Sequence, residues 1–160
     1  MAVPLVFITG ASSGIGQALA AHFAAAGWRL ALVARRAGEI EVWCRARGGP
    51  AERGEVYGAA VRDMSAITAA DRDCLECQGL PAVVIANAGI SVGVDTDEAQ
   101  DLEVIRATFE TNNLGMTATF QPFLKPMREL RRGTLVGVAS VAAIRGLPGH
   151  GPIAPARSQS

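Results

Sequence analysis

The segment TGASSGIG at residues 9–16 has the glycine spacing of a turn that binds phosphate groups. An apolar run precedes it, and a segment with helical spacing of apolar residues follows. Gly10 would allow a tight turn out of a strand, whereas Gly14 and Gly16 would let the backbone approach a pyrophosphate. A helix beginning here would add unpaired N–H groups and the positive end of its dipole. An ordinary glycine-rich strand–helix turn is the alternative. The residues expected to contact a dinucleotide are Gly10, Ser12, Ser13, Gly14, Ile15 and Gly16.

Three further stretches carry polar residues at positions where chemistry could occur: NAG at 87–89, NNLG at 112–115 and ASVAAIRGLPG at 139–149. Each has an ordinary structural explanation when it is considered alone. Asn87 could bind loop backbone groups, and Ser140 could cap a turn. Asn112 could hydrogen-bond a bend in a helix, since Asn is poor in helix interiors.

Together with the G-x-x-x-G-x-G spacing of the first turn, these stretches resemble the motifs of the short-chain dehydrogenase/reductase family over residues 3–149. The resemblance implies an NAD(P)-dependent oxidoreductase that moves a hydride between the nicotinamide and a small-molecule carbonyl or secondary alcohol. It implies that Ser140 polarises the carbonyl and that Asn112 positions a water in a proton relay. It also implies a homo-oligomer for the intact enzyme. The residues that would stabilise the sheet beside the cofactor are Asn87, Ala88 and Gly89.

Cofactor preference is predicted from the end of the second apolar run, RLALVAR at 29–35. An NAD-selective site usually has an acid there, which accepts from the ribose 2′-hydroxyl. Arg35 and Arg36 stand in its place and would suit a 2′-phosphate, so we expect NADP(H) rather than NAD(H); two solvated loop arginines are the alternative. After the third run, the resemblance implies that Asp63 accepts from the adenine amino group with Met64 against the ring. Asp63 as a plain turn residue is the alternative.

The last residues depart from the family's pattern. The family's catalytic Tyr and Lys would fall at Ile153 and Arg157. Ile has no proton to give, and the planar guanidinium of Arg differs from an ammonium in geometry and hydration. Codons for IAPARSQS at 153–160 can, after a one-base shift, encode Tyr-Ser-Ala-Cys-Lys-Val-Ala-Val, which restores Tyr and Lys at the required separation. We therefore predict a frame slip near Pro152, by sequencing error or mutation. It leaves an aberrant tail at 150–160 and a fold that is incomplete at its C-terminus; a natural divergent end is the alternative.

An enzyme with this tail is predicted to be impaired, because loss of a general acid alone costs about 10²–10⁴ in rate. Two other functions stay open. One is a non-catalytic dinucleotide-binding fragment, which needs the glycine turn and the arginine pair but no Tyr or Lys. The other is a gene remnant that neither folds stably nor binds cofactor. The fifth strand would form an exposed edge of the sheet, which predicts poor solubility.

The elements that would position these residues are predicted from alternating strand-like and helix-like segments. Runs rich in Val, Ile, Leu and Ala suit strands that are covered on both faces. They lie at 4–10, 29–35, 56–61, 81–89 and 133–140. This alternation predicts an α/β doubly wound parallel sheet, a Rossmann fold, with ligands beyond the carboxyl ends of the strands.

Helices are predicted from apolar spacing and from capping residues. The first contains Ile15, Leu19 and Phe23 at intervals of four. The second covers 65–79 with Ser65 as a possible cap. The third covers 96–110, with Thr96 as its cap, and the residues expected on its buried face are Leu102, Ile105 and Phe109. The segment 45–55 is predicted to be a loop by its Gly, Pro and charged residues.

Composition indicates one globular domain over residues 1–160, because 49% of the residues are hydrophobic and 19% are charged. A formal net charge of zero gives no indication of nucleic-acid or membrane-surface binding. No apolar run reaches the length of a membrane span, and the N-terminus lacks a basic segment typical of a signal peptide. Three Cys suggest no disulfide framework, so we expect a cytoplasmic protein. Cys74 and Cys77 are predicted to be apolar helix residues rather than a redox or metal pair, and no metal site is expected.

Overall fold

The computed structural model describes residues 2–46, 54–93 and 99–140 of the 160-residue chain. Five parallel strands form one sheet, and their bounds are β1 (Leu5–Thr9), β2 (Arg29–Ala34), β3 (Gly54–Gly58), β4 (Val83–Ala86) and β5 (Thr134–Gly137). Their order is β3-β2-β1-β4-β5. The first strand therefore lies in the middle, with β2 on one side and β4 on the other. Ligands of such sheets bind where the strand order reverses, which is here between β1 and β4.

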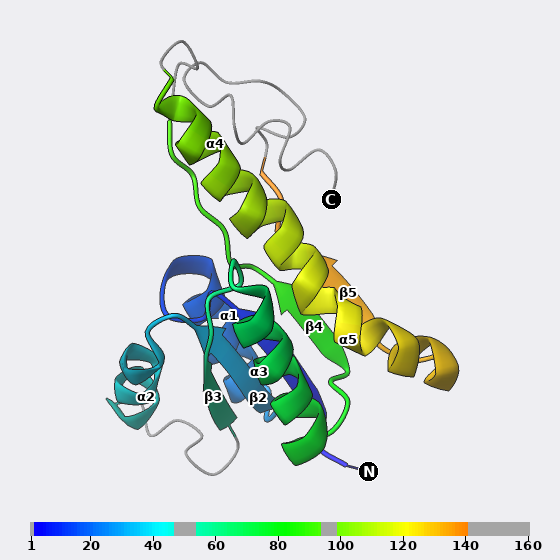
Figure 1. The fold of residues 1–160 in the computed structure, drawn as a ribbon. Helices are drawn as coiled ribbons and strands as arrows, with labels where there is room; N and C mark the ends of the chain where they lie inside the picture. Colours follow the sequence, from blue (N-terminus) through cyan, green and yellow to red (C-terminus); the bar gives the residue numbers. More distant parts are fainter. Residues whose placement is uncertain (1, 47–53, 94–98, 141–160) are drawn as a thin grey trace.

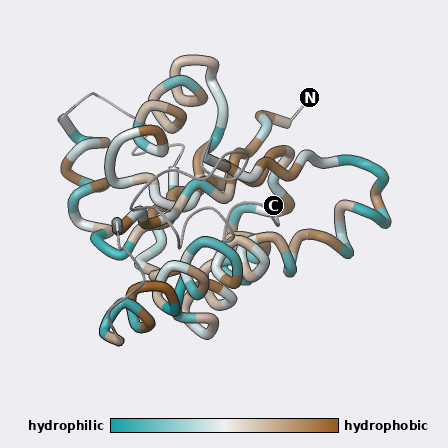
Figure 2. The backbone as a smooth tube through the Cα atoms, turned by 90° about the horizontal axis from the view of Figure 1, so that it is seen from above, coloured by the Kyte–Doolittle hydropathy of each residue, from teal (hydrophilic) through white to brown (hydrophobic). Residues whose placement is uncertain are grey.

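The helical elements are α1 (Gly14–Ala25), α2 (Ala37–Ala46), α3 (Met64–Cys77), α4 (Asp101–Phe109), the π-helical turn η1 (Glu110–Leu114) and α5 (Gly115–Leu130). Figure 1 shows α3 in front of the strands and α1 behind them, while α4, η1 and α5 follow one another as one long helix. Seen from above in Figure 2, hydrophobic and hydrophilic residues alternate along the helical turns, as expected for helices with one face on a sheet.

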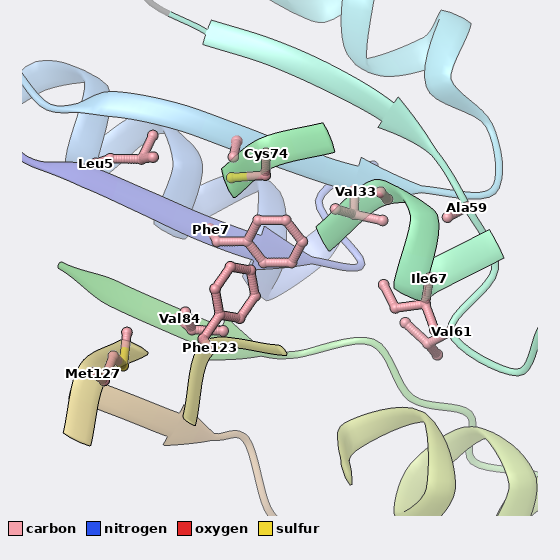
Figure 3. Close-up of a cluster of buried hydrophobic side chains, with 12 residues drawn as sticks. Leu5, Phe7, Val33, Ala59, Val61, Ile67, Cys74, Val84, Phe123 and Met127 are labelled. Carbon is pink, nitrogen blue, oxygen red and sulfur yellow. The ribbon is translucent and has the colours of Figure 1, made fainter. Parts of the chain in front are cut away.

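Each face of the sheet has its own hydrophobic core, because successive strand residues point to opposite faces. Phe7 on β1 packs with α3 and α5, whereas its neighbour Ile8 packs with α1 and α2. Figure 3 shows Phe7 and Phe123 side by side in the first of these cores, with ring centroids 5.1 Å apart. Cys74 also lies in this core, and burial raises the pKa of its thiol to about 12. Cys77, at the end of α3, is exposed and free.

All five predicted strands are present and the predicted fold class is confirmed, but several boundaries differ. The third strand begins at Gly54 rather than at residue 56, and α2 extends to Ala46, so the predicted loop at 45–55 is too long. The alternation predicts helices between the strands, but it gives no bounds for α2 and α5. The cap of α3 is Asp63 rather than Ser65, since the Asp63 carboxylate accepts from the backbone N–H groups of Ser65 and Ala66.

Two predicted core positions are exposed. Ile15 is 62% exposed, because the first turn of α1 faces the cleft described below. Leu102 is 67% exposed, and among the residues of α4 only Thr108 is buried. The predicted cap Thr96 lies outside the described residues.

Candidate functional site

A cleft of about 770 Å³ opens at the carboxyl ends of the central strands. It is bounded by the β1–α1 turn, by the residues after β2, β3 and β4, and by one residue of η1. The residues that line it are Gly10, Ser12, Ser13, Gly14, Ile15, Ala34, Arg35, Arg36, Ala59, Ala60, Val61, Arg62, Asp63, Asn87, Ala88, Gly89, Ile90 and Thr111. Of the predicted cofactor-binding residues, all but Gly16 and Met64 are in this lining.

The β1–α1 turn is built by glycines that no other residue could replace without strain. Gly10 has a φ of +69°, and a Cβ on it would lie 2.8 Å from Cα of Ala88. A Cβ on Gly16 would clash with the backbone carbonyl of Gly10. Gly16 is therefore buried beneath the turn, where it lets α1 pack closely, rather than in the wall of the cleft.

The start of α1 can hold an anion. Ser13 is the N-cap, yet its side chain makes no capping hydrogen bond, and the first turn has no acidic residue. A Cβ on Gly14 would meet nothing within 4 Å, so the backbone is open on this side. Unpaired N–H groups and the positive end of the helix dipole thus face a cleft, which is the donor set that a diphosphate requires.

Asn87, which directly follows β4, connects this strand to the β1–α1 turn through hydrogen bonds. Its Nδ2 donates to the carbonyl oxygens of Thr9 (3.1 Å) and Gly10 (3.2 Å). The buried Thr9 hydroxyl accepts from the backbone N–H groups of Asn87 and Ala88, each at 3.2 Å. The side chain of Asn87 satisfies loop backbone groups, and in doing so it fixes the wall of the cleft beside β1.

Two arginines line the cleft after β2. Arg35 and Arg36 are both exposed, and Arg36 forms an ion pair with Glu39 at 3.1 Å. No acidic residue follows β2 at this position. The cleft wall at the end of β2 can therefore attract an anionic group, although the surface pair with Glu39 competes for Arg36.

Asp63 lies in the cleft wall but already has a structural role. Its Oδ1 accepts from the hydroxyl of Ser65 at 2.6 Å and from the N–H groups of Ser65 and Ala66 at 3.0 Å each. These bonds, the Ser65 hydroxyl first, hold the pKa of the Asp63 carboxyl below its ordinary value. Met64 is 40% exposed and is not among the lining residues. In this structure Asp63 Oδ1 therefore acts as the acceptor of the turn that begins α3, which is the alternative given for Asp63 above.

Asn112 lies at the centre of the π-helical turn η1 and is 1% exposed. Its Oδ1 accepts from the backbone N–H of Ile90, and its Nδ2 donates to the carbonyl of the same residue, both at 2.9 Å. Ile90 lines the cleft, so Asn112 fixes the segment after β4 to the long helix. Local π-helical turns are frequent at functional sites. In this structure both polar atoms of the Asn112 side chain serve backbone groups, and neither faces the cleft.

The other predicted catalytic residue, Ser140, follows β5 and is half-buried. It stands after a carboxyl end of the sheet, as the cleft does, but it is not among the lining residues. Ile153 and Arg157 lie outside the described residues.

Sequence reasoning missed part of the cleft wall, notably Arg62 and Thr111. Arg62 directly precedes Asp63, and its Nε lies 3.3 Å from Oε2 of Glu110. The signal in the sequence for Arg62 is a basic residue in the segment that follows the third strand. Among the described residues no group of His, Cys, Asp or Glu could hold a metal ion, and no helix could cross a membrane.

Comparisons with known proteins extend over almost the whole chain. A sequence model described as short chain dehydrogenase matches residues 4–152. A protein of Myxococcus xanthus (strain DK1622), named as an uncharacterized oxidoreductase, is 32% identical over 157 residues, which cover 94% of this chain and 59% of that protein. The present chain thus spans less than two thirds of the length of this curated relative.

Solved structures also match almost the whole of this chain. A short-chain dehydrogenase from Streptomyces avermitilis matches with a TM-score of 0.91 and 26% identity, covering 99% of this chain and 57% of that one. An alcohol dehydrogenase from the archaeon Thermococcus sibiricus, solved in complex with 5-hydroxy-NADP, matches with a TM-score of 0.87 and 27% identity. This second match covers 98% of the present chain and 66% of the archaeal one.

Proposed function

Since the chain belongs to the short-chain dehydrogenase family, we propose that its cleft binds NADP(H) in an oxidoreductase of that family. The observation that carries the proposal is the open helix start and the arginine pair in one cleft. The N–H groups at Ser13 and Gly14 would hold the pyrophosphate. Arg35 and Arg36 would take a 2′-phosphate on the adenosine ribose. The archaeal alcohol dehydrogenase bound to a derivative of NADP supports a phosphorylated dinucleotide.

The substrate would be a small carbonyl compound or secondary alcohol. A bound nicotinamide supplies the site that donates or accepts the hydride. Ser140, which follows β5 at the carboxyl end of the sheet, would donate a hydrogen bond to the carbonyl oxygen. Asn112 would act through Ile90, by holding the segment after β4 in place.

A binding titration tests the cofactor assignment. Purified protein is titrated with NADP⁺ and, separately, with NAD⁺, and the binding of each is measured by calorimetry. We expect NADP⁺ to bind at least about tenfold more tightly, because charge-assisted hydrogen bonds to a phosphate are strong. The R35Q/R36Q double variant should lose this preference, whereas R72Q, an exposed arginine on α3 outside the cleft, should keep it. Equal affinity of the unaltered protein for the two dinucleotides would refute the assignment.

A second candidate function is dinucleotide binding without catalysis. It is favoured by Ile153 and Arg157, which occupy the positions of the family's Tyr and Lys. The only Tyr in the sequence, Tyr57, lies on β3 and donates its hydroxyl proton to Gln78 at 3.1 Å. Tyr57 is not among the residues that line the cleft, so it does not supply a general acid there.

We attribute this departure to a one-base shift of the reading frame near Pro152. The family model ends its match at residue 152, one position before Ile153, which supports a change of sequence character there. Resequencing of the gene across the codons for 150–160 tests the shift. An alternative reading frame that encodes Tyr-x-x-x-Lys at the family's position would support the shift. A second frame without family-like sequence would show that the tail is native, and carbonyl reduction should then be absent although dinucleotide binding persists.

A further inference from the structure

Arginine residues line the cleft after two neighbouring strands. Arg35 and Arg36 follow β2, and Arg62 follows β3. These strands pair in parallel, with Ala34 opposite Gly58, so the segments that follow them leave the sheet side by side. The backbone N–H of Ala59 also donates to the carbonyl of Ala34 at 3.2 Å. Three cationic side chains therefore border the same end of the cleft, on the β2 and β3 side of the glycine turn.

The arginines outnumber the acidic residues in the lining of this end of the cleft. Asp63 is the only acidic residue among those that line it, and its Oδ1 serves the start of α3. Glu39, the partner of Arg36, is outside the lining. Of the three arginines, Arg36 and Arg62 have glutamate partners outside the lining, so a polyanionic ligand would meet guanidinium groups here in competition with Glu39 and Glu110.

Arg62 is held from the side of the long helix. Its Nε approaches Oε2 of Glu110 at 3.3 Å, while Oε1 of Glu110 accepts from Nε of Arg106 at 2.8 Å. The Glu110 side chain is 27% exposed, less than half the 58% of Arg62. Arg62 is thus tethered to η1 by a carboxylate that is itself fixed, which reduces the conformational entropy Arg62 would lose on binding an anion.

We propose that Arg62 is a specificity-determining residue, a third guanidinium that favours dinucleotides with a phosphate on the adenosine ribose. The inference rests on the proposed function, which places the pyrophosphate at the start of α1. The residue after the second strand lies at the ribose 2′ position in such folds, so the adenosine half extends from the glycine turn toward β2 and β3. Arg62 stands on that path, one strand beyond Arg35 and Arg36.

The test compares ligands that differ by the ribose phosphate. Adenosine 2′,5′-bisphosphate and ADP are titrated into the unaltered protein and into R62Q, R62K and the control R72Q, and NADP⁺ and NAD⁺ follow. We expect R62Q to weaken binding of the 2′-phosphorylated ligands about tenfold and to change ADP and NAD⁺ binding less than about threefold. R62K should lose an intermediate amount, since an ammonium keeps the charge but not the fork of donors. R72Q should behave as the unaltered protein does.

Salt dependence provides a second measurement. If Arg62 contacts a phosphate, the affinity of R62Q for adenosine 2′,5′-bisphosphate should fall less steeply with salt than that of the unaltered protein. An equal loss for both classes of ligand, or no loss, would overturn the role of Arg62 while leaving the cofactor assignment intact. Failure of the unaltered protein to prefer 2′-phosphorylated ligands would overturn both. Melting temperatures of all variants establish that they are folded.

Discussion

At the scale of single residues, Asp71 on α3 differs from every other acidic residue in the described ranges. Its side chain is 0% exposed, and neither carboxyl oxygen has a hydrogen-bond partner in the structure. Burial raises its pKa to about 8 from an ordinary value of 3.8. Asp71 is therefore protonated in the folded protein at neutral pH, whereas in the unfolded chain it would be ionised.

This difference makes stability depend on pH in a definite direction. Because the folded pKa is the higher one, the stabilising contribution is complete below about pH 4 and is lost progressively as the pH rises to about 8. We expect D71N, which cannot ionise, to become more stable relative to the unaltered protein between pH 5 and pH 8, by about 3–4 kcal/mol. Urea unfolding of both proteins at pH 5 and at pH 8 measures this difference in the free energy of unfolding. The exposed D73N on the same helix is the control, and a constant difference between D71N and the unaltered protein would contradict the prediction.

At the scale of elements, the long helix and the segment after β4 are joined through one side chain. Asn112 of η1 provides both an acceptor and a donor to Ile90. Its neighbour Asn113 has a buried Oδ1 without a hydrogen-bond partner in the structure. The two residues are adjacent and chemically identical, but only the Oδ1 of Asn112 has a hydrogen-bond partner.

The pair allows a matched prediction. N112A should lower the free energy of unfolding by about 1–3 kcal/mol, because the N–H and carbonyl of Ile90 lose their partners. It should also weaken dinucleotide binding, since Ile90 lines the cleft. N113A should change stability by less than about 1 kcal/mol, because no hydrogen bond of its Oδ1 is lost. Denaturant unfolding and calorimetric titration measure the two effects, and equal losses in both variants would refute the special role of Asn112.

The elements also show what sequence could predict. Strands buried on both faces, such as β1 and β2, are evident as continuous apolar runs. The bounds of α5 have no clear local signal, because Pro122 and Pro126 lie inside it and proline normally ends a helix. Packing of Phe123 and Met127 into the core maintains the helix despite them. Tertiary packing of this kind cannot be deduced from local spacing.

The candidate site was predicted unevenly for a similar reason. Glycines and the first arginine pair have local signatures, so the residues of the turn and the end of β2 were identified. The role of Asn112 depends on Ile90, and that of Arg62 depends on Glu110, which is far along the chain. Contacts between distant segments exist only in the folded structure.

At the scale of the whole molecule, β5 pairs with β4 alone among the residues that the structure describes, so it lies at one edge of the described sheet. Val136 on this strand is 37% exposed. An edge strand with an exposed apolar side chain can pair with another chain. We therefore expect the association of chains that the sequence predicts to occur through β5.

Placing a charge on the edge should reduce association. We expect V136K to scatter less light than the unaltered protein as concentration rises, with a free energy of unfolding within about 0.5 kcal/mol. L102K is the control, because Leu102 is 67% exposed on α4 and away from the edge. If L102K suppressed association equally, net charge rather than the edge would be responsible.

The central position of β1 has a consequence for how the chain assembles. Parallel neighbours cannot be joined by a hairpin, so the pairs β1–β2, β2–β3 and β4–β5 are each joined by a crossover connection, whereas β1 and β4 become neighbours only after β2 and β3 have been passed. The strand synthesised first can pair with β2 once residue 34 has been made, but its other side has no partner until residues 83–86 exist. A nascent chain therefore carries a half-paired middle strand through much of its synthesis, and the sheet grows outward from its oldest part.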